Sequence, residues 1–403
     1  MPTRRDFLAT AALTSLAFTV DAQQTKITDG KAAESRTAAT PGKRPIMICS
    51  HNGYNYLDEG LAILTSTGET LDAALRVVRG PEDDPNDHSV GLGGLPNEDG
   101  VVELDSCCMH GPTRRGGAVG ALRDIRNASL VARAVMEHTG HVMLVGEGAT
   151  RFGLAQGFPK ENLLTDYSRK VWLLWKETNS DQDWWGPGIS DPNWKAPRPT
   201  AQREDMQKRL EQRAADLGIA PTLCAQAARE VMSPPTGTIH CSAVNAKGEM
   251  SGVTTTSGLA FKLSGRLGDS PIIGAGCYTD QDVGSAGATA SGEENIKVVG
   301  AHTIIENMRH GMSPHDAGMD ALKRIQRNYN GDMSRLKYID MVYYILRNDG
   351  AYAGVSLWTG YASDQGKPHY ICVHDGNKRR EPTTPLLQGY SLDFPPRRVV
   401  RSQ

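Results

Sequence analysis

Residue types able to do chemistry are concentrated in one stretch of the chain, residues 236–294. Thr238 follows Gly237, and glycine tolerates backbone geometry that other residues avoid. Three further threonines, 254–256, close the next strand-like segment. A threonine hydroxyl is a weak nucleophile by itself and becomes effective beside a general base. The stretch therefore offers a candidate hydroxyl nucleophile with other hydroxyl groups to support it.

The same stretch holds charged groups and a candidate oxyanion site. Arg266 and Asp269 lie three apart in a glycine-containing loop and supply one cation and one anion. Residues 289–292 (Thr-Ala-Ser-Gly) come just before an expected helix, where free N–H groups suit an oxyanion or a carboxylate. Each feature alone has an ordinary explanation, because threonine is common in strands and Arg-x-x-Asp is usually a surface ion pair. Together they suit an amidase.

Other familiar sites are missing from the sequence. It contains no His-Glu-x-x-His, no Gly-x-Ser-x-Gly and no Gly-x-x-x-x-Gly-Lys motif. His138 and His141 straddle an expected helix end without an acidic partner, so we interpret them as structural. The seven cysteines include no Cys-x-x-Cys, and we expect most to be small buried residues, with a disulfide left open. We predict no metal and no cofactor.

The elements expected to position these groups are hairpins and helices. The spacing of apolar residues predicts helices at about 56–67, 69–79 and 129–138. Residues 45–50 have the pattern of a buried strand. One hairpin joins TIHCSAV to EMSGVTTT, and a second turns around Asn348-Asp349-Gly350. Hairpins combined with paired helices favour α+β layers over a doubly wound parallel sheet.

A long segment without a strand pattern separates the two halves of the chain. Residues 161–235 show no strand pattern and include a stretch rich in Trp, Pro and Asp, followed by a charged helix that ends at Gly218. This is long for an ordinary connection. We interpret it as an irregular connector, either an inserted lid or a region that the fold need not keep continuous.

Composition and charge exclude some classes of function. The 403-residue chain has 39% hydrophobic residues and a formal net charge of −2. It can bury a full core, and near-neutral charge argues against nucleic acid as a partner. No apolar run reaches the roughly 18 residues that span a bilayer, so no membrane segment is predicted.

The first 22 residues have the pattern of an export signal. Arg4-Arg5 precedes an apolar run to Val20, and small residues end it near Ala22. This order favours a twin-arginine-like signal over a basic tail leading into a core helix. We expect residues 23–43 to be a flexible leader and the mature protein to be periplasmic or extracellular.

Several segments resemble one family closely. "GTI", "SGVTTTSG", "GRLGDSPIIGAGCY" and "GATASGEENI" are similar to the glycosylasparaginases, which are N-terminal nucleophile hydrolases of the threonine type. The N-terminal half continues the resemblance in "GETLDAA", "EDDPNDHSVGLGGLPNEDGVVELDSC", "SLVARAVMEHTGHVMLVGEGA" and "QGFPKENLLT". The resemblance covers nearly the whole chain after the signal, and "GRLGDSPIIGAG" is highly specific.

The resemblance implies a fold and a maturation step. Family members form a four-layer αββα sandwich and cut themselves before a threonine, here between Gly237 and Thr238. The products would be an α subunit, 44–237, and a β subunit, 238–403, packed as one domain. The freed α-amino group of Thr238, with an ordinary pKa of about 7.7–8.0, would then act as the general base.

The resemblance also implies roles for site residues. Thr256 would hydrogen-bond the nucleophile hydroxyl. Arg266 would hold the substrate α-carboxylate and Asp269 its α-ammonium group, beside Gly292. Thr289 and the N–H of Ala290 would form the oxyanion hole.

Four positions depart from the glycosylasparaginase pattern. Thr236 and Gly237 replace the usual His-Asp before the threonine, and Gly237 instead matches the isoaspartyl-peptidase/asparaginase branch. His51 replaces an early tryptophan, which puts sugar-side recognition in question. His240 places a bulky side chain where the family keeps none. Strand alternation favours an outward, ordinary orientation for it, whereas an inward one would alter cleavage or perturb the Thr238 amine.

We therefore predict an exported amidohydrolase that splits N-acetylglucosamine from the side chain of asparagine. One alternative is an isoaspartyl dipeptidase/L-asparaginase of the same family. Another is an uncleaved, non-catalytic relative that acts as a binding protein. The expected partner is a small-molecule substrate, glycosyl-asparagine or a β-aspartyl compound, and the expected assembly is a homo-oligomer of cleaved units.

Overall fold

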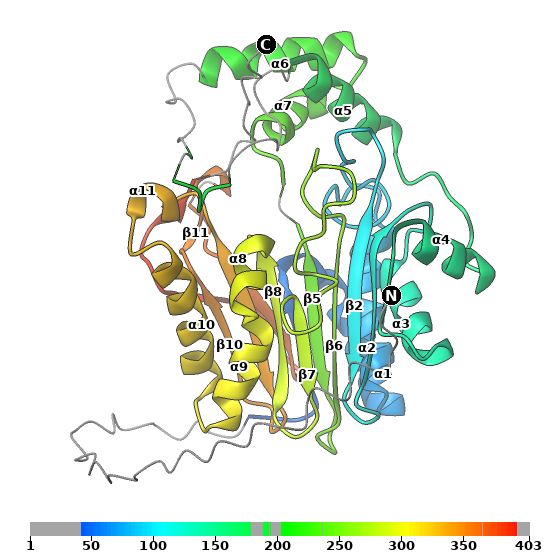
Figure 1. Cartoon of the computed structure of the whole chain (residues 1–403), viewed down its shortest axis with the longest axis vertical. Helices are drawn as coiled ribbons and strands as arrows, with labels where there is room; N and C mark the ends of the chain where they lie inside the picture. Colours follow the sequence, from blue (N-terminus) through cyan, green and yellow to red (C-terminus); the bar gives the residue numbers. More distant parts are fainter. Residues whose placement is uncertain are drawn as a thin grey trace, which may run out of the picture. The chain divides into compact units, whose positions relative to one another are not determined.

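A computed structural model describes residues 42–178, 188–192, 194, 203–235, 237–364 and 366–392, which belong to one compact unit. The predicted export signal and all but the last two residues of the predicted leader lie outside the described residues. The architecture is mixed α+β, as expected (Figure 1).

A mainly antiparallel eight-stranded sheet forms one half of the core. Both halves of the chain contribute to it, and the central strands are buried along their whole length because both faces of the sheet are covered. Its strands in spatial order are β13 (Lys378–Pro382), β12 (Tyr370–His374), β1 (Ile46–Ser50), β5 (Ile239–Val244), β6 (Met250–Thr256), β2 (Leu104–His110), β3 (Arg115–Leu122) and β4 (Met143–Val145).

A second sheet packs against the first. An apolar cluster between them combines residues of β1 and β5 with residues of β9, among them Ile48, Val244 and Val342. The strands of this sheet in spatial order are β14 (Thr384–Pro385), β10 (Tyr352–Ser356), β9 (Met341–Arg347), β8 (Gly284–Ala290) and β7 (Cys277–Asp280). A small separate pair joins β11 (Gly360–Tyr361) to β15 (Tyr390–Ser391).

Helices pack on the two sheets from different sides (Figure 1). Those with the first sheet are α1 (Leu57–Thr67), α2 (Thr70–Asp83), α3 (Ala128–His138) and α4 (Gly146–Ala155). Those with the second are α8 (Gly292–Val298), α9 (Gly300–Arg309) and α10 (Pro314–Asn328), followed by the short α11 (Met333–Leu336). Ser313 caps α10 by accepting from Asp316 N–H, with Pro314 at the first helical position.

The connector is more regular than predicted. Its described residues form three α-helices, α5 (Asp166–Thr178), α6 (Arg203–Asp216) and α7 (Cys224–Met232), at the top of Figure 1, with a short 3-10 helix (Pro221–Leu223) before α7. They enclose a small core of their own, in which Trp175 stacks on Phe261 with ring centroids 4.6 Å apart. Phe261 follows β6 in the chain, so a contact between residues far apart in the sequence stabilises this segment.

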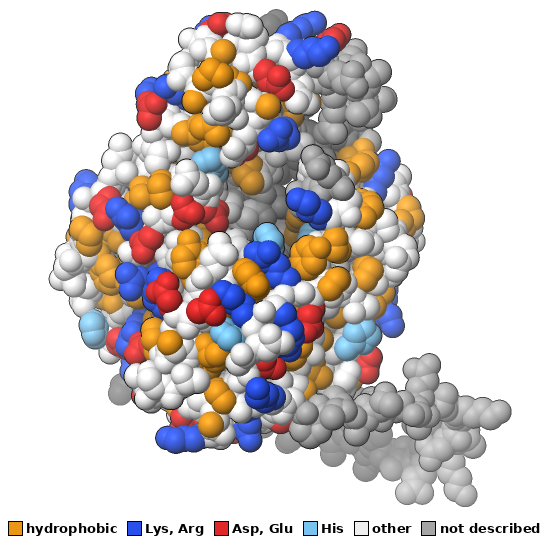
Figure 2. Space-filling model, turned by 180° about the vertical axis from the view of Figure 1, so that it is seen from behind, with side chains coloured by type: hydrophobic (Ala, Val, Ile, Leu, Met, Phe, Trp, Pro, Cys, Tyr) orange, Lys and Arg blue, Asp and Glu red, His pale blue; other side chains and the backbone are white. Residues whose placement is uncertain are grey.

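The face shown in Figure 2 is mixed in character. Lys and Arg side chains lie among Asp and Glu side chains, with hydrophobic side chains between them. None of the described helices has the length and apolar character needed to cross a bilayer.

Candidate active site

The Gly237–Thr238 peptide bond lies at the start of β5, beside the ends of β1 and β6. Thr256, the last residue of β6, donates from Oγ1 to the Gly237 carbonyl oxygen at 2.6 Å. Ser50, the last residue of β1, places its Oγ 3.5 Å from the Thr238 carbonyl oxygen and accepts from His240 N–H at 3.1 Å. Both neighbouring strands therefore hold the backbone around this bond.

Thr256 Oγ1 contacts the carbonyl side of the Gly237–Thr238 peptide bond, to which it donates. Its hydrogen bond to the Thr238 hydroxyl, expected for the cut enzyme, stays a prediction. Its oxygen also accepts from Gly258 N–H at 2.9 Å, which fixes its orientation. A donor aimed at a carbonyl oxygen stabilises the negative charge that develops there during nucleophilic attack.

Ser89 is a site residue that the sequence analysis missed. A Cβ atom at position 237 would lie 1.7 Å from Ser89 Oγ, so this close approach requires Gly237. Asp87 holds Ser89 in place, because its Oδ1 accepts from Ser89 Oγ at 2.5 Å and from Ser89 N–H at 3.1 Å. Ser89 lies within the segment "DPNDHSVGLGGLP", whose resemblance to the family was the signal that could have found it.

Arg266 pairs with Glu293 in the structure, so the surface ion pair with Asp269 that would be the ordinary explanation of Arg-x-x-Asp does not form. Its Nε and Nη2 both donate to Glu293 Oε1, at 2.8 and 2.6 Å. The Glu293 side chain is 55% exposed, whereas that of Arg266 is only 16% exposed. The Arg266 fork is thus set to receive a carboxylate, and a solvent-exposed side chain of the chain itself currently supplies one.

Asp269 is buried and has its own set of partners. Its Oδ2 accepts from Asn295 Nδ2 at 2.7 Å, and Asn295 in turn accepts from Tyr343 Oη at 2.8 Å. Burial raises the pKa of Asp269 to about 6, although the Asn295 hydrogen bond and the charge of Arg266 act in the opposite direction. A Cβ at Gly292 would lie 2.7 Å from Asp269 Oδ1, so the close approach of this carboxylate requires glycine there.

Thr289 and Ala290 end β8 next to these groups. Thr289 Oγ1 hydrogen-bonds Tyr344 Oη at 3.2 Å. Ala290 has a φ of 92°, a conformation that L-residues rarely adopt. Such strain costs of order 1–3 kcal/mol and is concentrated at functional sites. The structure thus brings Asp269, Gly292 and Arg266 together around the turn into α8, directly after Thr289 and Ala290.

Comparison with known proteins identifies the family of the chain. The model of the Asparaginase family matches residues 27–336. The chain is 35% identical over 383 residues to the N(4)-(beta-N-acetylglucosaminyl)-L-asparaginase of Elizabethkingia miricola, covering 94% of this chain and 95% of the relative. It is also 35% identical to the enzymes of that name from Rattus norvegicus and Mus musculus, each over 71% of this chain and 78% of the relative.

The chain belongs to the asparaginase family. It is an amidohydrolase, as the sequence analysis predicted.

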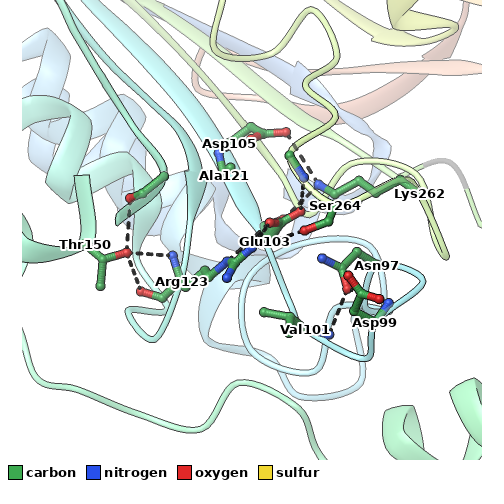
Figure 3. Close-up of polar contacts among 12 residues, drawn as sticks. Asn97, Asp99, Val101, Glu103, Asp105, Ala121, Arg123, Thr150, Lys262 and Ser264 are labelled. Atoms are coloured by element: carbon green, nitrogen blue, oxygen red, sulfur yellow. Dashed lines mark hydrogen bonds and ion pairs between the residues drawn. The ribbon is translucent and has the colours of Figure 1, made fainter. Parts of the chain in front are cut away.

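In this asparaginase-family chain, a buried ionic network supports the loop that carries Arg266 (Figure 3). Lys262 Nζ donates to the carbonyl oxygens of Glu103 and Ser257, both at 3.1 Å, and lies 3.8 Å from Asp105 Oδ2. Burial lowers the pKa of Lys262 and raises that of Asp105, and their mutual attraction opposes both changes. The network fastens the loop after β6 to strand β2.

Glu103 completes this support. Its Oε1 accepts from Arg123 Nη2 at 2.6 Å, and its Oε2 accepts from Gly265 N–H at 3.1 Å. Gly265 directly precedes Arg266, so the Glu103 carboxylate fixes the backbone from which the Arg266 side chain extends.

His240 points inward, so the predicted outward orientation is wrong. Its side chain is completely buried, and its ring lies nearly parallel to that of Tyr344, with centroids 6.2 Å apart. The expectation failed because β5 is a central strand with both faces covered, which leaves no outward face. A histidine fits here because residue 287 on β8 is glycine, where a Cβ would lie 1.9 Å from His240 Nδ1.

Proposed function

We propose that this asparaginase-family protein is a glycosylasparaginase that cuts its own chain before Thr238 and then hydrolyses the amide between N-acetylglucosamine and asparagine. The observation that carries the proposal is the Gly237–Thr238 bond at the start of a central strand, whose carbonyl accepts from Thr256 and whose glycine lies close against Ser89. The similarity to enzymes named for this activity, over 94% of the chain in one case, supports the choice of substrate.

Self-cleavage is an N-to-O acyl shift followed by hydrolysis. Thr238 Oγ adds to the Gly237 carbonyl carbon, the C–N bond breaks, and the hydroxyl proton ends on the departing nitrogen. Water then hydrolyses the ester, which frees the Gly237 carboxylate and the Thr238 hydroxyl and α-amino group. The Thr256 hydroxyl, 2.6 Å from the carbonyl oxygen, stabilises the charge that develops there. The two pieces, 44–237 and 238–403, form one αββα sandwich of the N-terminal nucleophile hydrolase type.

The cut chain then acts on substrate with the groups that the cut creates. The α-amino group of Thr238 takes the proton from Oγ, which attacks the side-chain amide carbon of the substrate. The leaving amine takes up that proton, and water releases aspartate from the ester. Thr289 and the N–H of Ala290 stabilise the oxyanion.

Substrate binding follows from the charges already in place. The substrate α-carboxylate replaces the exposed Glu293 carboxylate on Arg266, which costs little because an exposed ion pair contributes only about 0–1 kcal/mol. The α-ammonium group binds Asp269 beside Gly292. An α-amino acid with a side-chain amide satisfies both groups.

The second candidate is an isoaspartyl dipeptidase with asparaginase activity. Two positions favour it: Gly237, which matches that branch, and His51, which stands where glycosylasparaginases have tryptophan. The His51 side chain is exposed, with its ring centroid 6.2 Å from that of Tyr370. It offers a smaller and more polar surface to a leaving group than an indole would.

Intact-mass analysis of the purified protein tests self-cleavage. We expect a fragment that begins at Thr238, and we expect Thr238→Ala to stay in one piece and to be inactive. Thr256→Val, which keeps the shape but removes the donor, should slow the cut about 10²-fold or more. A wild-type protein found only at full length would contradict the proposal and favour a non-catalytic binding protein.

The substrate is tested by aspartate release from glycosyl-asparagine and from a β-aspartyl dipeptide. Higher kcat/KM for glycosyl-asparagine is expected, and the reverse order would reassign the enzyme to the second candidate. Export by residues 1–22 and assembly of the cut units into a homo-oligomer remain part of the proposal. Cell fractionation and light scattering test them.

A further inference from the structure

His240 belongs to a layer of buried polar side chains between the two sheets. Its Nδ1 lies 2.8 Å from Thr254 Oγ1 and its Nε2 lies 2.7 Å from Ser242 Oγ. From Ser242 the chain of hydroxyl groups continues to Ser285 Oγ at 2.8 Å and from there to Thr279 Oγ1, also at 2.8 Å. All five side chains are at least 95% buried.

Counting protons assigns a direction to each of these hydrogen bonds. Thr254 Oγ1 donates to the Gly276 carbonyl oxygen at 2.9 Å, and a hydroxyl has one proton, so it must accept from His240 Nδ1–H. If Nε2 carries no proton, it accepts from Ser242, which accepts from Ser285, which accepts from Thr279. An imidazole proton on Nδ1 thus leaves every hydroxyl in the chain with an acceptor.

The Thr254 end of the layer reaches the substrate-binding loop. The carbonyl oxygen of Gly276, which accepts from Thr254, also accepts from Ala288 N–H at 3.1 Å. Gly276 N–H in turn donates to the carbonyl oxygen of Asp269 at 3.1 Å. The His240 imidazole is therefore connected through Thr254 and Gly276 to the backbone of the residue that would bind the substrate ammonium group.

The ring face of His240 reaches the other part of the site. It stacks on Tyr344, whose hydroxyl bonds Thr289 Oγ1 at 3.2 Å. His240 lies two residues after Thr238, so these contacts connect the strand of the nucleophile both to Asp269 and to Thr289.

We propose that His240 is a positioning residue for this site. Its Nδ1–H, through Thr254 and Gly276, fixes the position of Asp269 relative to Thr238. The inference rests on the proposed function and adds to it a residue where this chain departs from the glycosylasparaginase pattern. Loss of the Nδ1 donor should raise KM, because it loosens Asp269, whereas loss of the ring alone should act on kcat through Tyr344 and Thr289.

Two amide replacements separate these effects. The side-chain N–H of asparagine takes the place of the histidine Nδ1–H, whereas that of glutamine takes the place of Nε2. We expect His240→Asn to keep KM within about threefold of wild type with a moderately lower kcat. His240→Gln should raise KM about tenfold or more. Thr254→Val, which removes the acceptor at nearly constant volume, should raise KM as His240→Gln does. The double variant His240→Gln/Thr254→Val should have a KM no higher than that of the more impaired single variant.

The control is Thr279→Val at the far end of the same hydroxyl chain, which should leave KM and kcat within about twofold. All rates are measured per molecule cut at Thr238, with whichever of the two substrates the wild type prefers. Equal KM changes in His240→Asn and His240→Gln, or an unchanged KM in Thr254→Val, would overturn the inference. If His240→Gln does not fold, Thr254→Val and the double variant His240→Asn/Thr254→Val still test the inference. A wild type that is neither cut nor active would refute the proposed function itself.

Discussion

At the residue scale, the candidate site is built from groups whose partners are already matched. Arg266 has a carboxylate, Asp269 has an amide donor, and the Gly237 carbonyl has a hydroxyl donor. Under the proposed function, a substrate would exchange partners at these groups and would not fill a set of unpaired charges. This keeps the cost of the buried Asp269 low before substrate arrives, because an unpaired buried charge is strongly unfavourable.

The pKa of Asp269 predicts a pH profile. Burial raises this pKa to about 6, so the carboxyl loses its charge, and its attraction for an ammonium group, as the pH falls through 6. The Thr238 amine must also be neutral to act as base, and its ordinary pKa is about 7.7–8.0. We expect log(kcat/KM) to fall with slope one below about pH 8 and with slope two below about pH 6.

Asp269→Asn should remove the steeper part of this profile and retain the slope of one, at much lower activity. Asp282→Asn, which alters an exposed aspartate paired with Arg114, serves as the control and should keep both slopes. A wild-type profile with a single slope down to pH 5 would contradict the role of Asp269.

At the element scale, the end of α2 is fastened to the sheet that carries the nucleophile. Glu82 is completely buried in the last turn of α2. It accepts from the N–H and the hydroxyl of Ser129 at the start of α3, at 2.9 and 2.7 Å, and from Thr255 Oγ1 on β6 at 2.7 Å. Strand alternation explains why neighbouring threonines of β6 have different partners: Thr254 and Thr256 face the second sheet, whereas Thr255 faces the helices.

Glu82→Ala should destabilise the fold by about 3 kcal/mol or more, because three buried donors lose their acceptor. Urea unfolding in the Thr238→Ala background measures this, since that chain stays in one piece and unfolds as a single molecule. Glu59→Ala is the matched control, because Glu59 is 57% exposed and paired with Arg76; its effect should stay below about 1 kcal/mol. Equal losses in the two variants would show that the Glu82 contacts do not stabilise the fold.

At the scale of the whole molecule, the two predicted pieces interleave within one sheet. The spatial order places β1, from the first piece, between β12 and β5 of the second, and β6 of the second against β2 of the first. The core under α1–α3 likewise combines residues from before and after the cut, such as Met47 with Ile239. Three strand ladders and a shared core therefore cross between the pieces.

The cut protein should therefore behave as one particle. We expect both fragments to elute together in size-exclusion chromatography in native buffer and to separate only in guanidinium chloride. The uncut Thr238→Ala protein is the reference and should elute at the same native volume. Separate native peaks would show that the fragments do not share the sheet described here.

The sequence by itself determined the features that depend on neighbours along the chain. Periodicity placed one helix at 56–67 and another at 129–138, and the structure has Leu57–Thr67 and Ala128–His138. Both predicted hairpins are present, because a tight turn needs only local residues. The family resemblance also pointed to Thr238, Arg266 and Asp269, whose residue types and spacing are visible in one segment.

Tertiary structure decided what depends on distant segments meeting. Arg266 pairs with Glu293, 27 residues further on, because the turn into α8 lies beside its loop. Ser89 meets Gly237 across almost 150 residues of chain. His240 turned inward because alternation specifies opposite faces but does not reveal that a central strand has both faces covered. Only the packing of the two sheets makes that histidine part of the site.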